Sequence, residues 1–314
     1  PPRLYGYDLF ARNDGNLFRG RFFGHLDFPR VLDGGLTGGM WSIATNILRG
    51  ERGRWRALQE NVAGLRAVIE ETEGRLEVVR DAAQWRAARE RGAHACLLSV
   101  QGGNAYDAVA DPSALQDIVR VTVMHLSDSK LGRTSSPLGF GRDTGLTRRG
   151  RSFVERLDAA RMFVDLAHID RPGFWDAVDV HDGSLPLIVT HTGVVGVHRH
   201  WRNVDDGQIR AVADTGGVIG IMYQTDFLRG PGMPNDASLV IAHLEHVIRV
   251  GGEAAAALGS DYDGAIVPPP DLRDGFAAAY VLVQRMLDRR WSEARIRGIL
   301  GDNFLRSFER LRPG

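Results

Sequence analysis

The feature that most constrains the fold of this chain is an ordered series of polar residues, each of which closes a short apolar run. The runs are rich in Val, Ile, Leu and Phe, as buried strands are, and helical patterns separate them. The residues that end the runs are His25, Asp27, Gln101, His125, His168, His191 and Asp261. The carboxyl ends of successive parallel strands gather at one end of a barrel. The pattern therefore predicts an α/β fold, a (β/α)8 TIM barrel, with these side chains gathered at one end.

The expected elements alternate along the whole chain. Strands are expected at 20–27, 41–45, 95–101, 121–126, 162–168, 186–192, 217–223 and 256–261. Helices are expected near 54–74, 81–92, 112–119, 148–161, 171–179, 205–214, 237–250, 273–289 and 292–311. Because we find no internal repeat and no linker, we expect a single barrel domain over residues 1–314 with helices at its C-terminal end.

Composition excludes several other classes of protein. A formal net charge of zero gives no electrostatic reason to expect nucleic acid or an anionic membrane as a partner. The single cysteine, Cys96, excludes an internal disulfide framework and CxxC zinc sites. No run of 18 apolar residues occurs, so no membrane span is expected. The first residues lack the apolar core of a signal peptide, which favours a cytoplasmic protein.

Four of the polar residues have the chemistry of metal ligands. In a strand over 20–27, His25 and Asp27 would share a face, because strand side chains repeat every second residue. Imidazole nitrogen and carboxylate oxygen suit zinc or a similar divalent ion. His168 and His191 follow two neighbouring strands. Each of these histidines alone would be unremarkable as a structural side chain, but together they indicate a metal site.

Three further residues suit roles in catalysis and substrate binding. His125 fits a substrate-polarising role better than a ligand role, with a structural histidine as the alternative. Asp261 and Asp263 lie in G-S-D-Y-D-G, where they are either a turn pair or a general base. Arg202 could hold a substrate carboxylate through a bidentate pair, although arginine more often lies on the surface.

These motifs occur in an order that matches one known family. They are G-H-L-D-F-P at 24–29, W-S-I at 41–43, Q-G-G-N-A-Y-D at 101–107, V-D-L-A-H at 164–168, V-T-H-T-G at 189–193, W-R-N-V-D-D at 201–206 and G-S-D-Y-D-G at 259–264. In these motifs and in its closing helices the chain resembles the membrane (renal) dipeptidases, peptidase family M19, of the amidohydrolase-like metal-dependent hydrolases. The resemblance spans nearly the whole chain and implies a zinc dipeptidase on a TIM barrel.

The resemblance implies a role for each matched residue. His25 and Asp27 resemble the ligands of one zinc, and His168 and His191 resemble those of a second. His125 matches the histidine that contacts the scissile carbonyl. Arg202 matches the arginine that binds the substrate's carboxylate, and Asp261 matches the aspartate that handles the proton.

The chain departs from the family at the residue that bridges the two metals. The family has a glutamate there, and this chain has Gln101. An amide offers one neutral oxygen where a carboxylate offers two anionic ones, so the repulsion between two cations loses its main offset. We therefore expect reduced occupancy, with one zinc ion or none favoured over two. A hydroxide, a substrate oxygen or a carboxylated Lys130, the only lysine, could replace the bridge.

The leading hypothesis is a dipeptidase-like metallohydrolase that cleaves a small dipeptide or related amide with a free carboxylate. Zinc-activated water would attack the amide, and activity would be weak or specialised because Gln101 replaces the bridging glutamate. The alternative is a non-peptidase or catalytically inactive family member that keeps a small-molecule pocket. The expected partner is a dipeptide or another small molecule, and a homodimer is left open.

Overall fold

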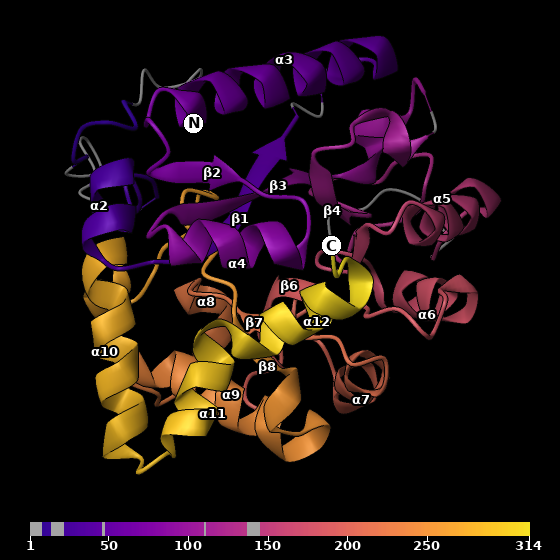
Figure 1. The fold of residues 1–314 in the computed structure, drawn as a ribbon. Helices are drawn as coiled ribbons and strands as arrows, with labels where there is room; N and C mark the ends of the chain where they lie inside the picture. The colour runs from indigo at the N-terminus through magenta and orange to yellow at the C-terminus, as the bar shows by residue number, and fades with distance from the viewer. Residues whose placement is uncertain (1–7, 14–21, 46–47, 110, 137–144) are drawn as a thin grey trace. The chain divides into compact units, whose positions relative to one another are not determined.

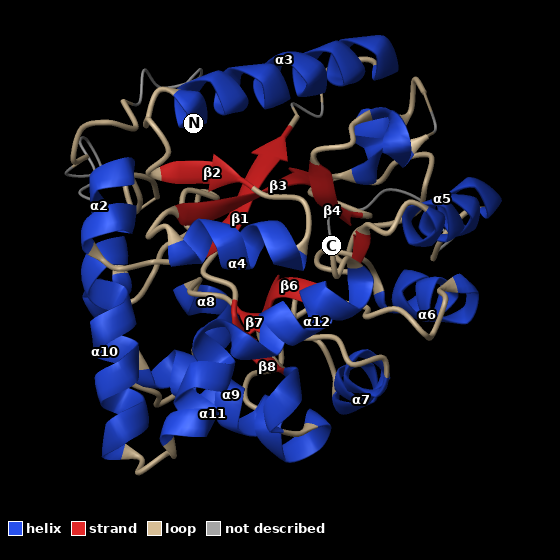
Figure 2. Ribbon diagram, in the orientation of Figure 1, coloured by secondary structure: helices blue, strands red, loops and turns tan. Residues whose placement is uncertain are grey.

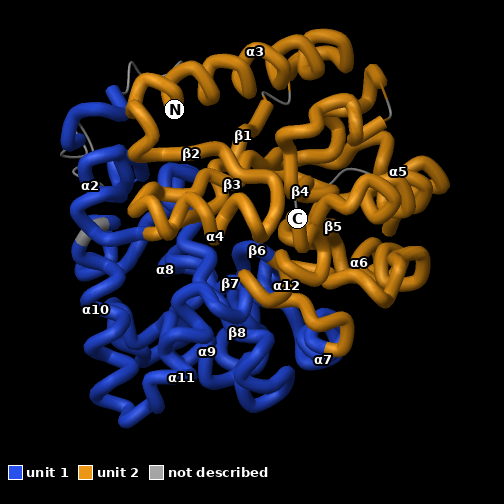
Figure 3. Tube along the Cα trace, in the orientation of Figure 1, with its two compact units in different colours: residues 1–36, 190–213, 219–304 blue, residues 37–189, 214–218, 305–314 orange. Residues whose placement is uncertain are grey.

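The chain alternates strands and helices through two compact units. A computed structural model describes residues 8–13, 22–45, 48–109, 111–136 and 145–314 (Figure 1). Unit 1 comprises Pro1–Leu36, Thr190–Ala213 and Ile219–Phe304. Unit 2 comprises Thr37–Val189, Asp214–Val218 and Leu305–Gly314 (Figure 3). Each unit is described by itself below.

Unit 2 is built on a parallel sheet of five strands. Its strands are β1 (Gly38–Ala44), β2 (Leu76–Val78), β3 (His94–Gln101), β4 (Ile118–Thr122) and β5 (Phe163–Asp165). They follow the order β1-β3-β4-β5, and β2 also pairs with β3. Register brings the carboxyl ends level, because Gln101 pairs with Ala44 and Thr122, and Thr122 pairs with Asp165. The sheet thus presents the last residues of four strands side by side.

The helices of unit 2 come between these strands along the chain, except α6, which follows β5 (Figure 2). They are α3 (Glu51–Glu70), α4 (Ala82–Glu90), the short η2 (Gly103–Tyr106) and η3 (Pro112–Ala114), α5 (Arg148–Ala159) and α6 (Arg171–Val180). The side chains of Asp81, Thr147 and Asp170 accept a backbone hydrogen bond at the N-termini of α4, α5 and α6. Residues of α5 and α6 contact each other. Strands joined through helices are the βαβ arrangement that the sequence pattern predicts.

Unit 1 contains a second parallel sheet, in which β6 (Val189–Thr192), β7 (Ile219–Ile221) and β8 (Ala256–Leu258) follow in order; Val189 itself belongs to unit 2. Its helices are α2 (Phe28–Asp33), α7 (Asp206–Asp214, of which Asp214 belongs to unit 2), α8 (Thr225–Leu228), α9 (Ser238–Gly251), η4 (Glu253–Ala255), η5 (Pro270–Leu272), α10 (Gly275–Asp288), α11 (Glu293–Arg297) and the π-helical η6 (Gly298–Asp302). The last helix, α12 (Asn303–Leu311), begins in unit 1 and lies mainly in unit 2.

Some expected elements are wrong in place or type. The expected strand at 20–27 is absent from described residues 22–27, where a loop leads into α2. The reason is local: Asp27 caps the helix and a proline lies in its first turn. The expected helix at 112–119 is a single 3₁₀ turn followed by β4, and the expected helix at 292–311 is divided into α11, η6 and α12. The three-residue strand β2 was not expected.

No helix in the described part of the chain is long and apolar enough to cross a membrane.

Candidate metal centre

Gln101 lies at the carboxyl end of β3 in unit 2. Its side-chain Oε1 atom is buried and has no hydrogen-bond partner among the residues that the structure describes. A buried amide oxygen without a donor costs free energy, because it has given up its water without a replacement. This oxygen is therefore one place in unit 2 where a cation, a water or a substrate group would be stabilised.

His125 and His168 follow the next two strands of the same sheet and lie against each other. Their ring centroids are 4.8 Å apart and the rings meet edge to face at 84°. Gly102, next to Gln101, has a φ of +103°, and a Cβ added there would lie 3.4 Å from the Cβ of His125. The positive φ favours glycine at this position, where a Cβ would also lie 2.9 Å from Oδ1 of Asn104. The predicted proximity of His125 and His168 is thus present within unit 2.

Left-handed backbone at residues other than glycine is concentrated in the segments after strands. Of eight such residues in the described ranges, Glu73, Arg161 and Arg290 follow helices. The other five follow β4, β5 and β8, and they are Leu126, His168, Asp261, Asp263 and Ala265. Strained conformations of this kind persist where the surroundings require them, and they occur often at functional sites. Two of the predicted site residues, His168 and Asp261, are in this group.

A buried polar network lies inside the sheet of unit 2. The Arg120 guanidinium, in β4, pairs with Asp165 of β5 at 3.1 Å, and the two side chains are 2% and 0% exposed. Thr122 donates to the same Asp165 oxygen at 2.6 Å. The other Asp165 oxygen accepts the backbone N–H of Ala167 at 3.1 Å. Asp165 therefore connects Arg120 and Thr122 of β4 with the segment that leads to His168.

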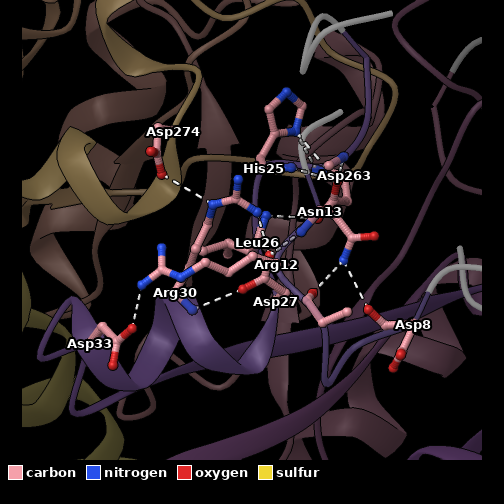
Figure 4. Close-up of polar contacts among 12 residues, drawn as sticks. Asp8, Arg12, Asn13, His25, Leu26, Asp27, Arg30, Asp33, Asp263 and Asp274 are labelled. Carbon is pink, nitrogen blue, oxygen red and sulfur yellow. Dashed lines mark hydrogen bonds and ion pairs between the residues drawn. The ribbon is translucent and has the colours of Figure 1, made fainter. Parts of the chain in front are cut away.

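In unit 1, both carboxylate oxygens of Asp27 already accept hydrogen bonds from the protein (Figure 4). Oδ1 accepts the backbone N–H of Arg30 at 2.8 Å and so caps α2. Oδ2 accepts the backbone N–H of Asn13 at 2.9 Å and pairs with the Arg30 guanidinium. Asp27 is fully buried, so this set of donors satisfies a charge that water cannot reach.

His25 is held by the loop that contains Asp263. The backbone N–H of Asp263 donates to His25 Nδ1 at 3.1 Å, and the Tyr262 ring stacks on the imidazole at 5.0 Å between centroids. The Asp263 carboxylate in turn accepts the backbone N–H groups of residues 24–26 at 2.7, 3.2 and 3.3 Å (Figure 4). The Nδ1 atom of His25 therefore already has a protein donor.

His191, within β6, and Arg202, which follows β6, are brought together in unit 1. Nη2 of Arg202 donates to the backbone carbonyl of His191 at 2.7 Å. Thr190 Oγ1 lies 2.8 Å from His191 Nδ1. Both predicted site residues are 4% exposed, so Arg202 is not the ordinary surface arginine of the alternative interpretation. Asp261, the predicted proton carrier, is half-buried after β8 and accepts the backbone N–H of Gly264 at 3.1 Å through its carbonyl oxygen.

Four histidines outside the predicted site contact protein partners. His94 accepts the indole N–H of Trp41 at 3.1 Å, and His246 lies 2.6 Å from Asp206. His243 accepts the Val194 N–H and donates to the Leu228 carbonyl, and burial lowers its pKa to about 4. For His181, burial alone would lower the pKa, but the hydrogen bond and charge of Asp158 outweigh it and raise the pKa.

Lys130 forms an ion pair with Glu51, and its side chain is 56% exposed. An exposed, paired ammonium does not suit the buried carboxylated bridge considered above. Of the three possible replacements for the bridge, the contacts of Lys130 therefore disfavour the carboxylated lysine.

The donors of the two units differ in how well they fit a zinc ion. No cluster of three or more His, Cys, Asp or Glu side chains able to hold a metal occurs within the described ranges. In unit 2, the imidazole of His168 is a donor type that zinc accepts, and the Gln101 oxygen is a neutral donor without a described partner. In unit 1, Asp27 and His25 fit poorly as they lie, because protein donors occupy the carboxylate and the Nδ1 atom.

Sequence reasoning missed two parts of this arrangement. The Arg120–Asp165 pair was signalled by charged residues inside the apolar runs I-V-R-V-T and F-V-D, which have no reason to occur there unless they pair. The hydrogen bonds between the Asp263 carboxylate and residues 24–26 join positions more than 230 apart in the sequence. No local sequence pattern predicts them.

Comparison with known proteins identifies the same family as the motifs. The profile of membrane dipeptidase (peptidase family M19) matches residues 9–312. An uncharacterized protein in the pqqA 5′ region of Klebsiella pneumoniae is 29% identical over 222 residues, covering 67% of this chain and 80% of that protein.

Two solved structures extend the comparison to the fold. A dipeptidase AC of family M19 is 25% identical with a TM-score of 0.81, covering 92% of this chain and 90% of that chain. A metallo peptidase from Rhodobacter sphaeroides is 25% identical with a TM-score of 0.78, covering 91% and 90%. The predicted fold class is confirmed: the chain has an α/β fold with parallel sheets that matches the TIM-barrel-like structures of these dipeptidases. The chain belongs to the membrane dipeptidase family, peptidase family M19, and is a dipeptidase-like hydrolase of that metal-dependent family.

Proposed function

We propose that the protein is a zinc-dependent dipeptidase with an atypical metal site, which cleaves a small dipeptide or related amide bearing a free carboxylate. The observation that supports it best is the contact between His125 and His168, with ring centroids 4.8 Å apart after neighbouring strands, in a chain of this family. The structure of the Rhodobacter sphaeroides relative holds a phosphinate mimic of the dipeptide L-Ala-D-Ala. We extend that substrate class to this chain, with a D-residue allowed at the carboxyl side.

In this proposal His125, Asp261 and Arg202 each have a separate role in the reaction. A bound zinc would supply activated water near neutral pH. His125 would donate a hydrogen bond to the developing oxyanion of the scissile carbonyl. Asp261 would accept the proton of the attacking water and pass it to the leaving amine. Arg202 would hold the substrate's carboxylate and so fix the register of the dipeptide.

We propose one bound zinc rather than two. His25, Asp27, His168 and His191 remain the proposed ligands on the strength of the family motifs, with Gln101 as a neutral contributor. The contacts of Asp27 with Arg30 and Asn13 support reduced occupancy, because a metal would have to displace them. Gln101 adds no negative charge to hold a second ion.

The alternative function is a non-peptidase or catalytically inactive family member with a retained pocket. The same contacts of Asp27 and His25 favour it. A panel of dipeptides, including D-residues at the carboxyl side, separates the two when amine release is measured with added zinc.

We expect hydrolysis by the wild type, a loss of roughly 10²–10³ in kcat for His125→Ala, and little loss for the control His181→Gln. His181 is a suitable control because it also lies in unit 2 and contacts Asp158 at 2.8 Å and the Leu185 carbonyl at 3.0 Å. Failure to cleave any dipeptide with zinc present would reject the dipeptidase in favour of the alternative.

A further inference from the structure

Leu126, directly after His125, has a backbone conformation that a leucine adopts at a cost. Its φ is +52°, and the N–H of Ser127 donates to the carbonyl of His125 at 2.6 Å, which closes a three-residue turn around it. A side chain with a Cβ is strained in the left-handed region, whereas glycine is not and asparagine tolerates it. A turn of this shape therefore gives no reason of its own for leucine.

The side chain of Leu126 is also placed unfavourably in water. It is 60% exposed. Among the described left-handed residues other than glycine, the rest are charged or polar, apart from Ala265. Leu126 is the one large apolar side chain in that set. A single exposed leucine needs no explanation, but an exposed leucine held in a strained turn does.

The position of this turn relates it to the proposed chemistry. Leu126 follows β4, and its neighbour His125 contacts His168 with 4.8 Å between ring centroids. In the proposed reaction His125 meets the scissile carbonyl. The carbon of that carbonyl is bonded directly to the Cα that carries the side chain of the substrate's amino-terminal residue. The group next to His125 is thus suited to meet that side chain rather than the carboxyl-terminal one.

We propose that Leu126 is a specificity residue, which contacts the side chain of the amino-terminal residue of a dipeptide and selects an apolar one. This inference rests on the proposed function. Contact between two apolar side chains removes both from water. The Leu126 side chain, which is exposed in the free protein, would therefore be shielded from water in the complex. The strained turn is then the means by which a side chain is presented beside His125.

Leu126→Gly tests the proposal in the full-length protein with added zinc. Three substrates are compared, Leu-Ala, Ala-Ala and Ala-Leu, by hydrolysis and by calorimetric binding. We expect the kcat/KM ratio of Leu-Ala to Ala-Ala to fall by roughly tenfold, as the loss of apolar contacts in a pocket does. The ratio of Ala-Leu to Ala-Ala should stay unchanged, and Leu126→Met should keep the wild-type preference.

A matched control comes from Arg161, which has the same φ of +52° but follows α5. Arg161→Gly also relieves a strained backbone, and we expect it to change no substrate ratio. We expect neither glycine variant to lower the melting temperature. An unchanged melting temperature shows that the substrate ratios are compared between folded proteins. An unchanged Leu-Ala to Ala-Ala ratio in Leu126→Gly, or a change at the carboxyl-terminal position instead, overturns the proposal.

The two proposals fail in different ways. A wild type that binds dipeptides without cleaving them rejects the dipeptidase, and Leu126 is then judged by the binding ratio of Leu-Ala to Ala-Ala, measured by the same calorimetry. A wild type that binds no dipeptide of the panel, those with D-residues included, overturns both.

Discussion

The H-L-D segment of unit 1 and the end of β3 in unit 2 differ in how far protein donors occupy the atoms that could bind a metal. Asp27 accepts hydrogen bonds at both oxygens and His25 accepts one at Nδ1. Gln101, at the end of β3, has a buried oxygen with no hydrogen-bond partner in the described part of the chain. Protein donors thus occupy the carboxylate of Asp27 and Nδ1 of His25, whereas no described donor occupies Oε1 of Gln101.

This difference teaches that residue type alone does not make a metal ligand. A carboxylate that caps a helix and pairs with an arginine is stabilised in the apo protein, so a cation must compete with those donors. A neutral oxygen without a partner meets no such competition, although it attracts a cation less strongly than a carboxylate does. We infer that zinc affinity at Asp27 is limited by competition with protein donors. At Gln101 it is limited by the lack of a negative charge.

The largest effect on stability is expected from breaking the buried Arg120–Asp165 pair in the sheet of unit 2. Arg120→Met leaves the fully buried Asp165 without its cation, and we expect a loss of about 3–5 kcal/mol in the free energy of unfolding. Urea unfolding of the zinc-free protein measures it. The double variant Arg120→Met/Asp165→Leu is the control and should recover much of the loss, because no buried charge remains unpaired. A loss below about 1 kcal/mol for Arg120→Met would show that the pair does not support this region.

The next effect tests whether the H-L-D segment is structural without a metal. Asp27→Ala removes the cap of α2 and the partner of Arg30, and we expect a loss of about 2–4 kcal/mol in the presence of a chelator. Asp81→Ala, which removes the cap of α4 alone, should cost about 1 kcal/mol. If chelated Asp27→Ala is as stable as the wild type, the carboxylate serves a metal only, and the contrast between the two regions is lost.

A smaller effect is expected in the pH dependence of the free energy of unfolding, to which the buried histidines His243 and His181 should contribute with opposite sign. Burial lowers the pKa of His243 to about 4, so its neutral form stabilises the fold above the ordinary histidine pKa and that stability is lost as pH falls. By pH 5 the loss should reach roughly 2 kcal/mol, and it should be absent from His243→Gln. Urea unfolding between pH 7.5 and pH 5 measures the difference.

His181 is the control, with the opposite sign. Its pKa is raised because the hydrogen bond and charge of Asp158 outweigh burial, so its contribution is present at low pH and is lost as pH rises through the raised pKa. His181→Gln should therefore cost more at pH 5 than at pH 8. Equal slopes for both variants would show that neither histidine has the state that its contacts imply.

Much of the fold could be predicted because long apolar runs leave few alternatives. The expected strand at 95–101 agrees with β3 to within one residue, since nearly every side chain of β3 is buried. The strand expected at 20–27 was wrong because D-F-P, a cap followed closely by proline, outweighs the apolar residues around it. The strand β2 has three residues, too few for any period to be recognised.

The candidate site could be predicted less completely than the fold. The order of motifs identified the family, and it placed His125 and His168 after neighbouring strands. The state of Asp27 depends partly on Asn13, and that of His25 on Asp263, which no spacing rule connects. The single domain over residues 1–314, the cytoplasmic location and the homodimer stay predictions.

Zinc analysis of the purified protein, wild type beside Gln101→Glu, tests the central claim most directly. If the neutral amide limits the metal site, the wild type holds at most one zinc per chain after equilibration with excess metal. Gln101→Glu then holds more zinc and cleaves dipeptides faster, because an anionic oxygen again offsets the repulsion between two cations. Two zinc ions in the wild type, or an unchanged content in Gln101→Glu, would contradict the account.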